Sequence, residues 1–306
     1  MTSLAPAMKE TNGDTPGSLP TGRRTQRRNK RSPLRILVHV TVIVLTVIWF
    51  TPVLALFTTS LRTQKDVAAN GWWMAFIQPR LTGFNYQQAL DLVGIGPSIA
   101  TSLAISIPTT IMTTVFSALG AYALTRMSFK GRTSLSLLLV ALLVIPPQVT
   151  LVPLLRLFQD MGLNGSVPAV WLYQVGFTVP FGIFLLRGFM ASIPQELFES
   201  AAIDGATPLR IFRTMVLPLS VPVMVSLAIM AFLWSWNDLL VPLLFLGGSD
   251  LANPLTVQVA GLAQTTGQGE AAMMAATFIS IIVPLTVIVS LQRFFVRGIL
   301  GGAVKG

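Results

Sequence analysis

The chain has 306 residues, of which 53% are hydrophobic and 10% charged, and its mean hydropathy is +0.71. This composition excludes an ordinary water-soluble domain and indicates an integral membrane protein. The formal net charge is +10 and cysteine is absent, so disulfide bonds and thiolate metal sites are excluded as well.

The N-terminal tail, residues 1–33, is rich in Gly, Pro, Thr and Ser and then in Arg, which predicts a disordered basic tail. Its basic run, Gly22–Arg31, is compatible with nucleic-acid binding, but it closely precedes an apolar span. We therefore interpret it as a topology signal near anionic headgroups, with membrane lipid and not nucleic acid as its partner. The apolar run that follows has 22 residues and no A-x-A site, so we expect an uncleaved anchor and not a signal peptide.

The rest of the chain, residues 34–306, forms the second predicted domain and contains six apolar segments. Each approaches or exceeds the ~20 residues that cross about 30 Å of hydrocarbon as a helix. We therefore predict an all-α integral membrane protein with six transmembrane helices, kinked where prolines fall inside them. The segments are Ile36–Phe57, Ile99–Leu124, Ser134–Leu155, Pro168–Leu186, Leu219–Leu246 and Ala272–Leu291.

Lysine and arginine are distributed unevenly between the two sides of this bundle, with 17 on the side of the N-terminus and 4 on the other. Because basic residues are enriched in cytoplasmic loops, both termini are predicted to be cytoplasmic. The same count puts the loop between the fourth and fifth spans in the cytoplasm.

Three features lie in and between the first spans. The outer loop Ser60–Ser98 holds a Gly-Trp-Trp sequence at residues 71–73, aromatic side chains that either anchor at the membrane interface or contact a binding protein. In the third span, a double proline before Gln148 either opens backbone groups toward a cavity or makes a simple kink. The second span carries a stripe of small side chains, which favours helix packing over a hydroxyl-lined solute path. The stripe consists of Ser102, Ser106, Thr110, Thr114 and Ala118.

A polar segment, Ser192–Pro218, separates the fourth and fifth spans and predicts a helix-turn-helix suited to docking another protein. Ser192 and Gln195 form a capping box that starts the first helix. Gly205 ends that helix, and Thr207-Pro208 supplies the N-cap and first position of the second, which runs to the end of the segment.

The fifth span ends in a cluster of polar and aromatic residues. If the span begins at Pro218, Asp238 lies about 30 Å further along the helix, near the outer mouth, which argues against a proton relay at the membrane midplane. Trp234, Trp236, Asn237 and Asp238 offer ring stacking and hydrogen bonds to a sugar. The alternative, equally open, is an aromatic belt with an interfacial cap or a contact with a partner subunit.

Catalysis by this chain is not expected. None of the five Lys residues follows a Gly, so a phosphate-binding P-loop is absent and any ATP hydrolysis must come from another polypeptide. A single His, His39, without Cys cannot assemble an ordinary zinc or nucleophile–base site, and no acid pair has a spacing that argues for hydrolysis.

The polar segment resembles the EAA motif of the inner-membrane permease subunits of binding-protein-dependent ABC importers. Glu199, Ala201, Gly205, Leu217 and Pro218 match that motif in identity and spacing, while Ser and Met replace its usual second Ala and its Ile. The sequence IDGA at 203–206, the Trp-Asn-Asp triplet and the C-terminal ending are similar to the carbohydrate branch of that family, and Gly-Trp-Trp at 71–73 to its alpha-glucoside subgroup.

The resemblance implies a multi-pass subunit of the bacterial cytoplasmic membrane. Its implied partners are a second permease, two ATP-binding subunits, an extracytoplasmic solute-binding protein and a sugar, which we expect to be a di- or oligosaccharide such as an alpha-glucoside. ATP and Mg²⁺ would be bound by the partner ATPase, and no cofactor by this chain. The residues implied in ATPase coupling are Glu199, Ala201, Asp204, Gly205, Ala206, Leu217, Pro218 and Lys305, and those proposed for the substrate path are Trp234, Trp236, Asn237, Asp238 and Gln148.

Other transporter classes fit less well. An importer for peptides, amino acids or metals shares the polar segment and differs only in the carbohydrate features. A secondary transporter needs ionisable groups near the midplane or inverted repeats, and neither is evident in the sequence. A purely structural membrane scaffold does not need the polar segment.

Overall fold

The computed structural model describes residues 33–91, 94–247, 253–263 and 269–303. Within them the regular elements are helices joined by turns and loops, and one isolated antiparallel bridge joins Arg62 and Leu81. The predicted tail lies outside the described residues apart from Pro33, and so does Lys305. The chain divides into two compact units, 1–49 and 50–306. The described part of the first unit is the beginning of α1, whose side chains are exposed from Arg35 onward.

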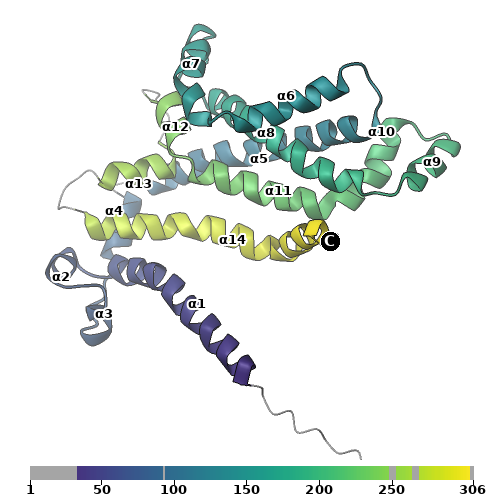
Figure 1. The fold of residues 1–306 in the computed structure, drawn as a ribbon. Helices are drawn as coiled ribbons and strands as arrows, with labels where there is room; N and C mark the ends of the chain where they lie inside the picture. Colours follow the sequence, from purple (N-terminus) through teal and green to yellow (C-terminus); the bar gives the residue numbers. More distant parts are fainter. Residues whose placement is uncertain (1–32, 92–93, 248–252, 264–268, 304–306) are drawn as a thin grey trace, which may run out of the picture. The chain divides into compact units, whose positions relative to one another are not determined.

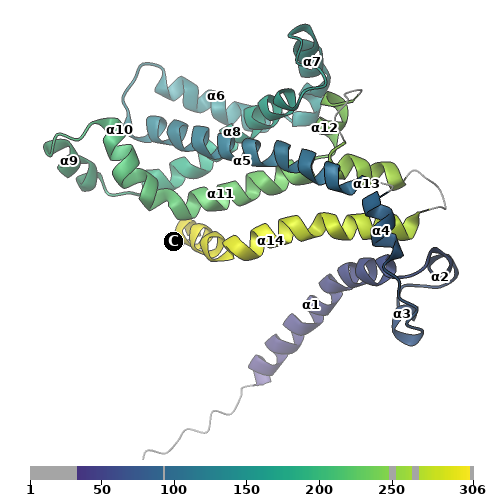
Figure 2. The ribbon, with the colours of Figure 1, turned by 180° about the vertical axis from the view of Figure 1, so that it is seen from behind.

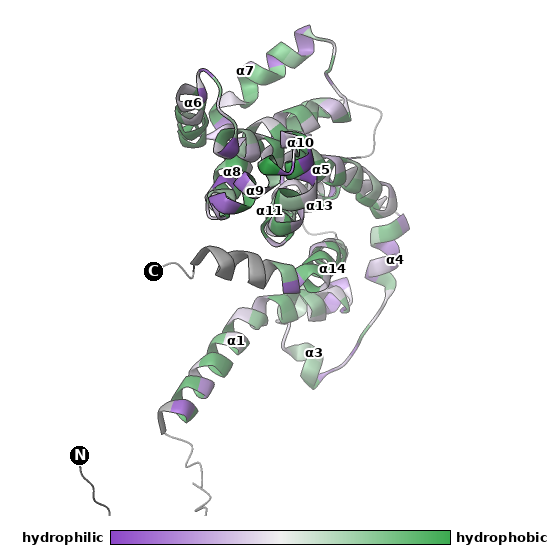
Figure 3. Ribbon diagram, turned by 90° about the vertical axis from the view of Figure 1, so that its right-hand side faces the viewer, coloured by the Kyte–Doolittle hydropathy of each residue, from purple (hydrophilic) through white to green (hydrophobic). Residues whose placement is uncertain are grey.

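Five helices among the described residues are long and apolar enough to span a membrane, and a bent helix pair raises this to as many as six. Figure 3 shows these long helices largely in the colour of hydrophobic residues and much of α9 in that of hydrophilic ones. The prediction of an all-α membrane protein is confirmed. The five are α1 (Pro33–Ser60), α5 (Ile95–Arg126), α8 (Val167–Ala191), the continuous stretch Pro208–Asn237 and α14 (Glu270–Ala303).

The third predicted span is not one straight helix. It consists of α6 (Arg132–Val144) and α7 (Pro147–Asp160), which meet at an angle of 103°. The double proline explains the break: Pro146 has extended backbone, with ψ at 124°, as expected of a residue that precedes another proline, and neither ring can donate an N–H.

The fifth predicted span also ends earlier than expected, at Asn237 and not at Leu246. Asp238 is extended, with ψ at 123°, and a separate short helix, α12 (Leu240–Phe245), follows it. The predicted outer loop after α1 contains three helices of its own, and a further helix precedes α14. These are α2 (Gln64–Ala69), α3 (Met74–Ile77), α4 (Phe84–Asp91) and α13 (Leu255–Ala263).

Helices α5, α8 and α11 (Leu217–Asn237) pack side by side (Figures 1 and 2). A close approach joins Gly182 of α8 to Ser117 of α5, where a Cβ atom on the glycine would lie 2.1 Å from the serine Oγ. Small side chains permit such an approach between membrane helices. The predicted packing role holds for the small residues of α5, but the buried face is rotated from the predicted stripe, since Thr110 and Thr114 are only half-buried. The small buried residues of this face are Ser98, Ser102, Ser106, Thr109, Thr113, Ser117, Ala118 and Ala121.

Three apolar clusters hold the larger unit together. The first lies where the ends of α5 and α8 meet the beginning of α11 and includes Leu186 and Met190. The second joins α7, α8 and α12, and the third joins α11 to α14, α13 and α4. The clusters therefore fix both ends of α8 and α11, which are the ends that carry the polar groups described next.

Candidate functional site

The first arm of the polar segment is α9 (Gln195–Ile203), and Gly205 ends it as predicted. Gly205 has φ at +73°, a left-handed conformation that glycine adopts without a Cβ penalty. The N–H of Ala206 donates to the Ala201 carbonyl at 3.0 Å and that of Gly205 to the Ala202 carbonyl at 3.0 Å. This is the Schellman pattern, in which two carbonyls at the helix end are satisfied and the flanking apolar residues meet.

The start of α9 differs from the prediction, and the capping box is wrong. Ser192 is the last residue of the preceding turn, and its Oγ donates to the Phe189 carbonyl at 2.8 Å. Pro194, which is extended, takes the N-cap position, so α9 begins at Gln195. A serine hydroxyl can donate to a carbonyl at the end of one helix or accept from an N–H at the start of the next. Here it donates to a carbonyl at the end of α8.

The second arm begins as predicted and then continues into the long apolar helix α11. Thr207 caps α10 (Pro208–Ile211), with its Oγ1 accepting from the Arg210 N–H at 3.3 Å. The helix does not end at Leu217-Pro218, because a π-helical turn (Phe212–Val216) joins α10 to α11. Pro218 has no N–H to donate to the α-helical pattern, and the wider π-helical turn directly before it accommodates the missing hydrogen bond.

The polar segment presents an exposed face with acidic and apolar side chains. Glu199, Asp204 and Gly205 are exposed, while Ala201 and Ala206 are half-buried against the first apolar cluster. Leu217 and Pro218 lie at the beginning of α11, the first half-buried and the second exposed. Sequence reasoning did not single out Ile203 as a contact residue. Its side chain lies between these acids and is 87% exposed. An exposed large apolar side chain among acids is typical of a contact surface.

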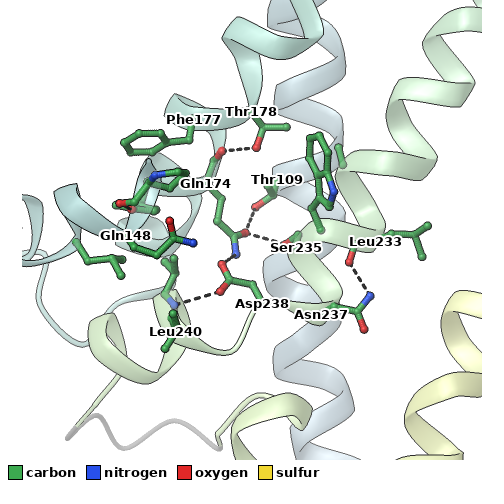
Figure 4. Close-up of a pocket in the computed structure, with 16 residues that line it drawn as sticks. Thr109, Gln148, Gln174, Phe177, Thr178, Leu233, Ser235, Asn237, Asp238 and Leu240 are labelled. Atoms are coloured by element: carbon green, nitrogen blue, oxygen red, sulfur yellow. Dashed lines mark hydrogen bonds between the residues drawn. The ribbon is translucent and has the colours of Figure 1, made fainter. Parts of the chain in front are cut away.

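A cavity of about 600 Å³ lies toward the other end of α8 and α11. Its walls come from α5, α7, α8, α11 and α12 (Figure 4). It has polar and aromatic lining, with Tyr173, Phe177 and Trp234 supplying the rings. Its polar side chains are Thr109, Gln148, Gln174, Thr178, Ser235, Asn237 and Asp238.

Gln174 stands at the centre of the polar network in this cavity (Figure 4). Its Oε1 accepts from Ser235 Oγ at 2.7 Å and from Thr109 Oγ1 at 3.3 Å, and its Nε2 donates to Asp238 Oδ2 at 2.9 Å. The other carboxylate oxygen of Asp238 accepts from the Val241 N–H at 3.2 Å. One amide thus joins α5, α8 and α11 and fixes the direction of the carboxylate. Sequence reasoning missed Gln174, although an amide inside an apolar span is itself a signal.

Four of the five residues predicted for the substrate path line this cavity, and Trp236 does not. Trp234 is 48% exposed and meets Phe181 edge to face. Trp236 is 1% exposed, stacks on Phe232 and donates its Nε1 hydrogen to the Ser280 carbonyl of α14. Residues two apart on a helix point in nearly opposite directions, so these two tryptophans cannot share one cavity.

The remaining predicted path residues are accessible at the cavity. Asn237 is exposed and its Nδ2 donates to the Leu233 carbonyl at 2.8 Å, which leaves its side-chain oxygen available. Gln148, at the start of α7, is exposed. Among the described residues, no group of three His, Cys, Asp or Glu side chains is arranged to hold a metal ion.

Comparison with known proteins identifies the family. The family described as "Binding-protein-dependent transport system inner membrane component" matches residues 115–301. This range contains both the polar segment and most of the cavity wall. The chain belongs to this family.

Relatives of known name agree with that assignment. The osmoprotective compounds uptake permease protein GgtD of Synechocystis is 43% identical over 88% of this chain and 91% of its own length. The alpha-glucoside transport system permease protein AglG of Rhizobium meliloti is 43% identical over 77% of this chain, which spans 63% of that protein. The melibiose/raffinose/stachyose import permease protein MelC of Bacillus subtilis is 32% identical over 84% of this chain.

A solved structure shares the fold of this permease. A bacterial ABC transporter that imports the acidic polysaccharide alginate contains a chain that superimposes with a TM-score of 0.71, at 20% identity, over 86% of this chain and 96% of that one. The resemblance to the permeases of binding-protein-dependent ABC importers, drawn from the polar segment, is confirmed by the family match and by the named relatives.

Proposed function

We propose that this permease forms half of the translocation path of an ATP-driven importer for a di- or oligosaccharide of the alpha-glucoside class. One observation carries the proposal: helices α8 and α11 bear an exposed acidic segment at one end and a polar, aromatic cavity toward the other. The names of the relatives AglG and MelC supply the solute class. A subunit that joins a motor contact to a solute cavity needs both features on the same helices.

The polar segment is proposed as the contact for a partner ATPase. Its exposed acids, Glu199 and Asp204, suit basic side chains of a partner, and Ile203 offers an apolar anchor between them. Gly205 sets the turn that brings the two arms together. The distribution of Lys and Arg supports a cytoplasmic position for this segment and for both termini, on the side where ATP is available.

The cavity is proposed as part of the sugar path. Sugar rings have apolar faces that stack on aromatic side chains and hydroxyl groups that pair with amides and carboxylates. Trp234 supplies an accessible ring, and Asn237, Gln148 and Asp238 supply the polar groups. Gln174 keeps the carboxylate of Asp238 in one orientation, so its acceptor sites are preorganised for hydroxyl donors.

The proposed assembly contains a second permease of the same family, two ATP-binding subunits and an extracytoplasmic solute-binding protein. The alginate transporter has been solved in complex with a periplasmic protein that carries an alginate pentasaccharide. That complex supports a solute-binding protein as a partner, which we propose delivers the sugar to the cavity end of this permease.

The test uses the absence of native cysteine in the chain. Asp204→Cys, co-expressed with the partner subunits, is expected to cross-link to the ATPase subunit and to resist a membrane-impermeant thiol reagent added from outside. Lys65→Cys, exposed in α2, is the matched control. It should be labelled by the reagent from outside and should not cross-link to the ATPase subunit. Labelling of Asp204→Cys from outside, or cross-links that never capture an ATPase, would refute the proposal.

A second solute class is favoured by one observation. GgtD, which is 43% identical over most of this chain, is named for osmoprotective compounds. The two candidates separate in a binding assay with the cognate solute-binding protein. Stabilisation by alpha-glucosides, and not by small osmoprotectants, supports the first; the reverse result supports the second.

A further inference from the structure

The end of α5 holds the first arm of the polar segment through one side chain. Arg126, the last residue of α5, donates from Nη2 to the Met190 carbonyl at 2.8 Å and to the Ile193 carbonyl at 2.6 Å. These are carbonyls at and just beyond the C-terminus of α8, where the regular helical hydrogen bonds run out and a cation is stabilised by the helix dipole. The Met190 carbonyl also accepts from the Ile193 N–H at 3.4 Å. Arg126 Nη1 also donates to Gln195 Oε1 at 2.8 Å, at the start of α9.

The same guanidinium covers the one buried side chain of α9. In α9, which the structure describes in full, Phe198 is the buried residue, and Arg126 Cζ lies 3.9 Å from the centre of its ring. A cation over an aromatic face adds attraction that a neutral side chain does not provide. The planar fork of arginine makes these bonds and the ring contact together, which the single ammonium of lysine cannot do.

One turn earlier on α5, a second side chain holds the other arm. The Tyr122 hydroxyl donates to the Pro208 carbonyl at 2.8 Å, in the first turn of α10. The Tyr122 ring packs on Phe212 of the π-helical turn, with 5.1 Å between ring centres. Tyr122 is 7% exposed, so water competes little for this bond. Figures 1 and 2 both show the end of α5 next to α10.

The other half of α5 reaches the cavity. Thr109 precedes Arg126 by 17 residues, which is about 25 Å along a helix. Its hydroxyl donates to Gln174 in the polar network. Helix α5 therefore contacts both arms of the polar segment at one end and the cavity network further along. In the sequence it is separated from the segment by α6, α7 and α8.

We propose that Arg126 and Tyr122 are positioning residues that tie the polar segment to α5, so that the segment and α5 move as one body when the ATPase moves the segment. The inference rests on the proposed function of the polar segment as the ATPase contact. Without these two side chains the partner still binds the exposed face, but its movement reaches the cavity through α8 and α11 alone. The coupling of ATP hydrolysis to uptake is then weakened.

The first experiment measures distance in the assembled wild-type transporter. Spin labels at Ser128→Cys, after the end of α5, and Ser200→Cys, on α9, occupy exposed positions on the two sides of the tie. Their distance distribution is expected to be narrow and unchanged between nucleotide-free and ATP-trapped states, and to broaden when Arg126→Gln is added. A distance that shifts through the cycle of the otherwise unchanged protein would overturn the proposal.

The second experiment measures coupling in proteoliposomes that contain the full transporter and its binding protein. Arg126→Gln is expected to lower sugar uptake per ATP hydrolysed at least tenfold while the yield of assembled complex stays within twofold. Arg132→Gln is the control, because it removes a positive charge at the start of α6, where the guanidinium makes bonds of 3.3 and 3.4 Å to nearby carbonyls. Uptake per ATP within twofold of wild type for Arg126→Gln would overturn the inference.

A milder variant decides the matter if Arg126→Gln fails to assemble. Tyr122→Phe keeps the ring on Phe212 and removes only the bond to Pro208, so a severalfold loss of coupling is expected and unchanged coupling contradicts the tie. The cross-link from Asp204→Cys to the ATPase separates the two hypotheses. If the cross-link forms and coupling is unaffected by either variant, the tie is wrong and the proposed docking stands; if it never forms, the docking itself is wrong.

Discussion

Replacing Gly182 by alanine is expected to destabilise the packing of α5 against α8. The added Cβ would lie 2.1 Å from Ser117 Oγ, 2.7 Å from Ser117 Cβ and 3.0 Å from Leu227 Cδ2. Carbon atoms in contact prefer about 3.5–4.0 Å, so rotation of the serine hydroxyl cannot relieve the overlap with its Cβ and the helices must separate by roughly 1 Å. Overpacking of this size costs about 1–3 kcal/mol. For a chain of 306 residues the Tm then falls by roughly 2–5 °C.

Thermal unfolding of the purified complex measures the effect, and two further variants test its cause. Gly188→Ala, also in α8, is the matched control because a Cβ there meets no atom within 4 Å, so its Tm should stay close to wild type. Ser117→Gly removes both clashing atoms, so the double variant with Gly182→Ala should recover most of the loss, with a coupling energy of about 1–3 kcal/mol. Equal Tm values for Gly182→Ala and Gly188→Ala, or no recovery in the double variant, would refute the packing argument.

Three further predictions concern the polar segment and the cavity. Gly205→Ala forces a left-handed conformation on a residue with a Cβ, at a cost of about 1–2 kcal/mol, so uptake should fall while membrane insertion, measured by fractionation, stays normal. Uptake should fall less in Gly205→Asn, and a larger loss in Gly205→Asn than in Gly205→Ala would contradict this. Gln174→Leu leaves the Ser235 hydroxyl and one oxygen of Asp238 unpaired, so thermal unfolding should show a loss of about 1–3 kcal/mol and uptake assays a raised KM, whereas an unchanged Tm and KM would speak against the network. Trp236→Ala should cost about 3–5 kcal/mol in stability and Trp234→Ala little, with the loss of Trp234 seen in uptake kinetics instead; equal effects on stability would show that the two rings are not placed as described.

The parts of the polar segment that follow from neighbouring residues could be predicted from the sequence. Gly205 ends α9 and Thr207 caps α10 because a left-handed glycine and a side-chain oxygen before a helix act within one turn of chain. Ser192 shows the limit of the same reasoning. Its hydroxyl lies between the end of α8 and the start of α9. Because Pro194 takes the N-cap position of α9, the hydroxyl bonds to the end of α8.

The cavity could be predicted only in part, because its network joins three helices. Asp238 and Asn237 were found through their place at the end of an apolar span. Gln174 was not, because its importance comes from Ser235 and Thr109, which lie 61 and 65 residues away in the chain. The two tryptophans could have been separated by helical periodicity alone, since it puts residues two apart on opposite faces.

The contacts within the trio of α5, α8 and α11 bear on where the transporter moves. The trio is joined by Gln174 at the cavity, by the close approach of Gly182 to Ser117 between the ends, and by Arg126 and Tyr122 at the polar segment. A motion that opened α5 away from α8 would disturb the contacts at all three places at once. The lower-cost motion keeps the trio intact and moves it against its neighbours. A lever that turns three helices together changes the whole cavity wall that they share, and this is what a segment placed at their common end is suited to do.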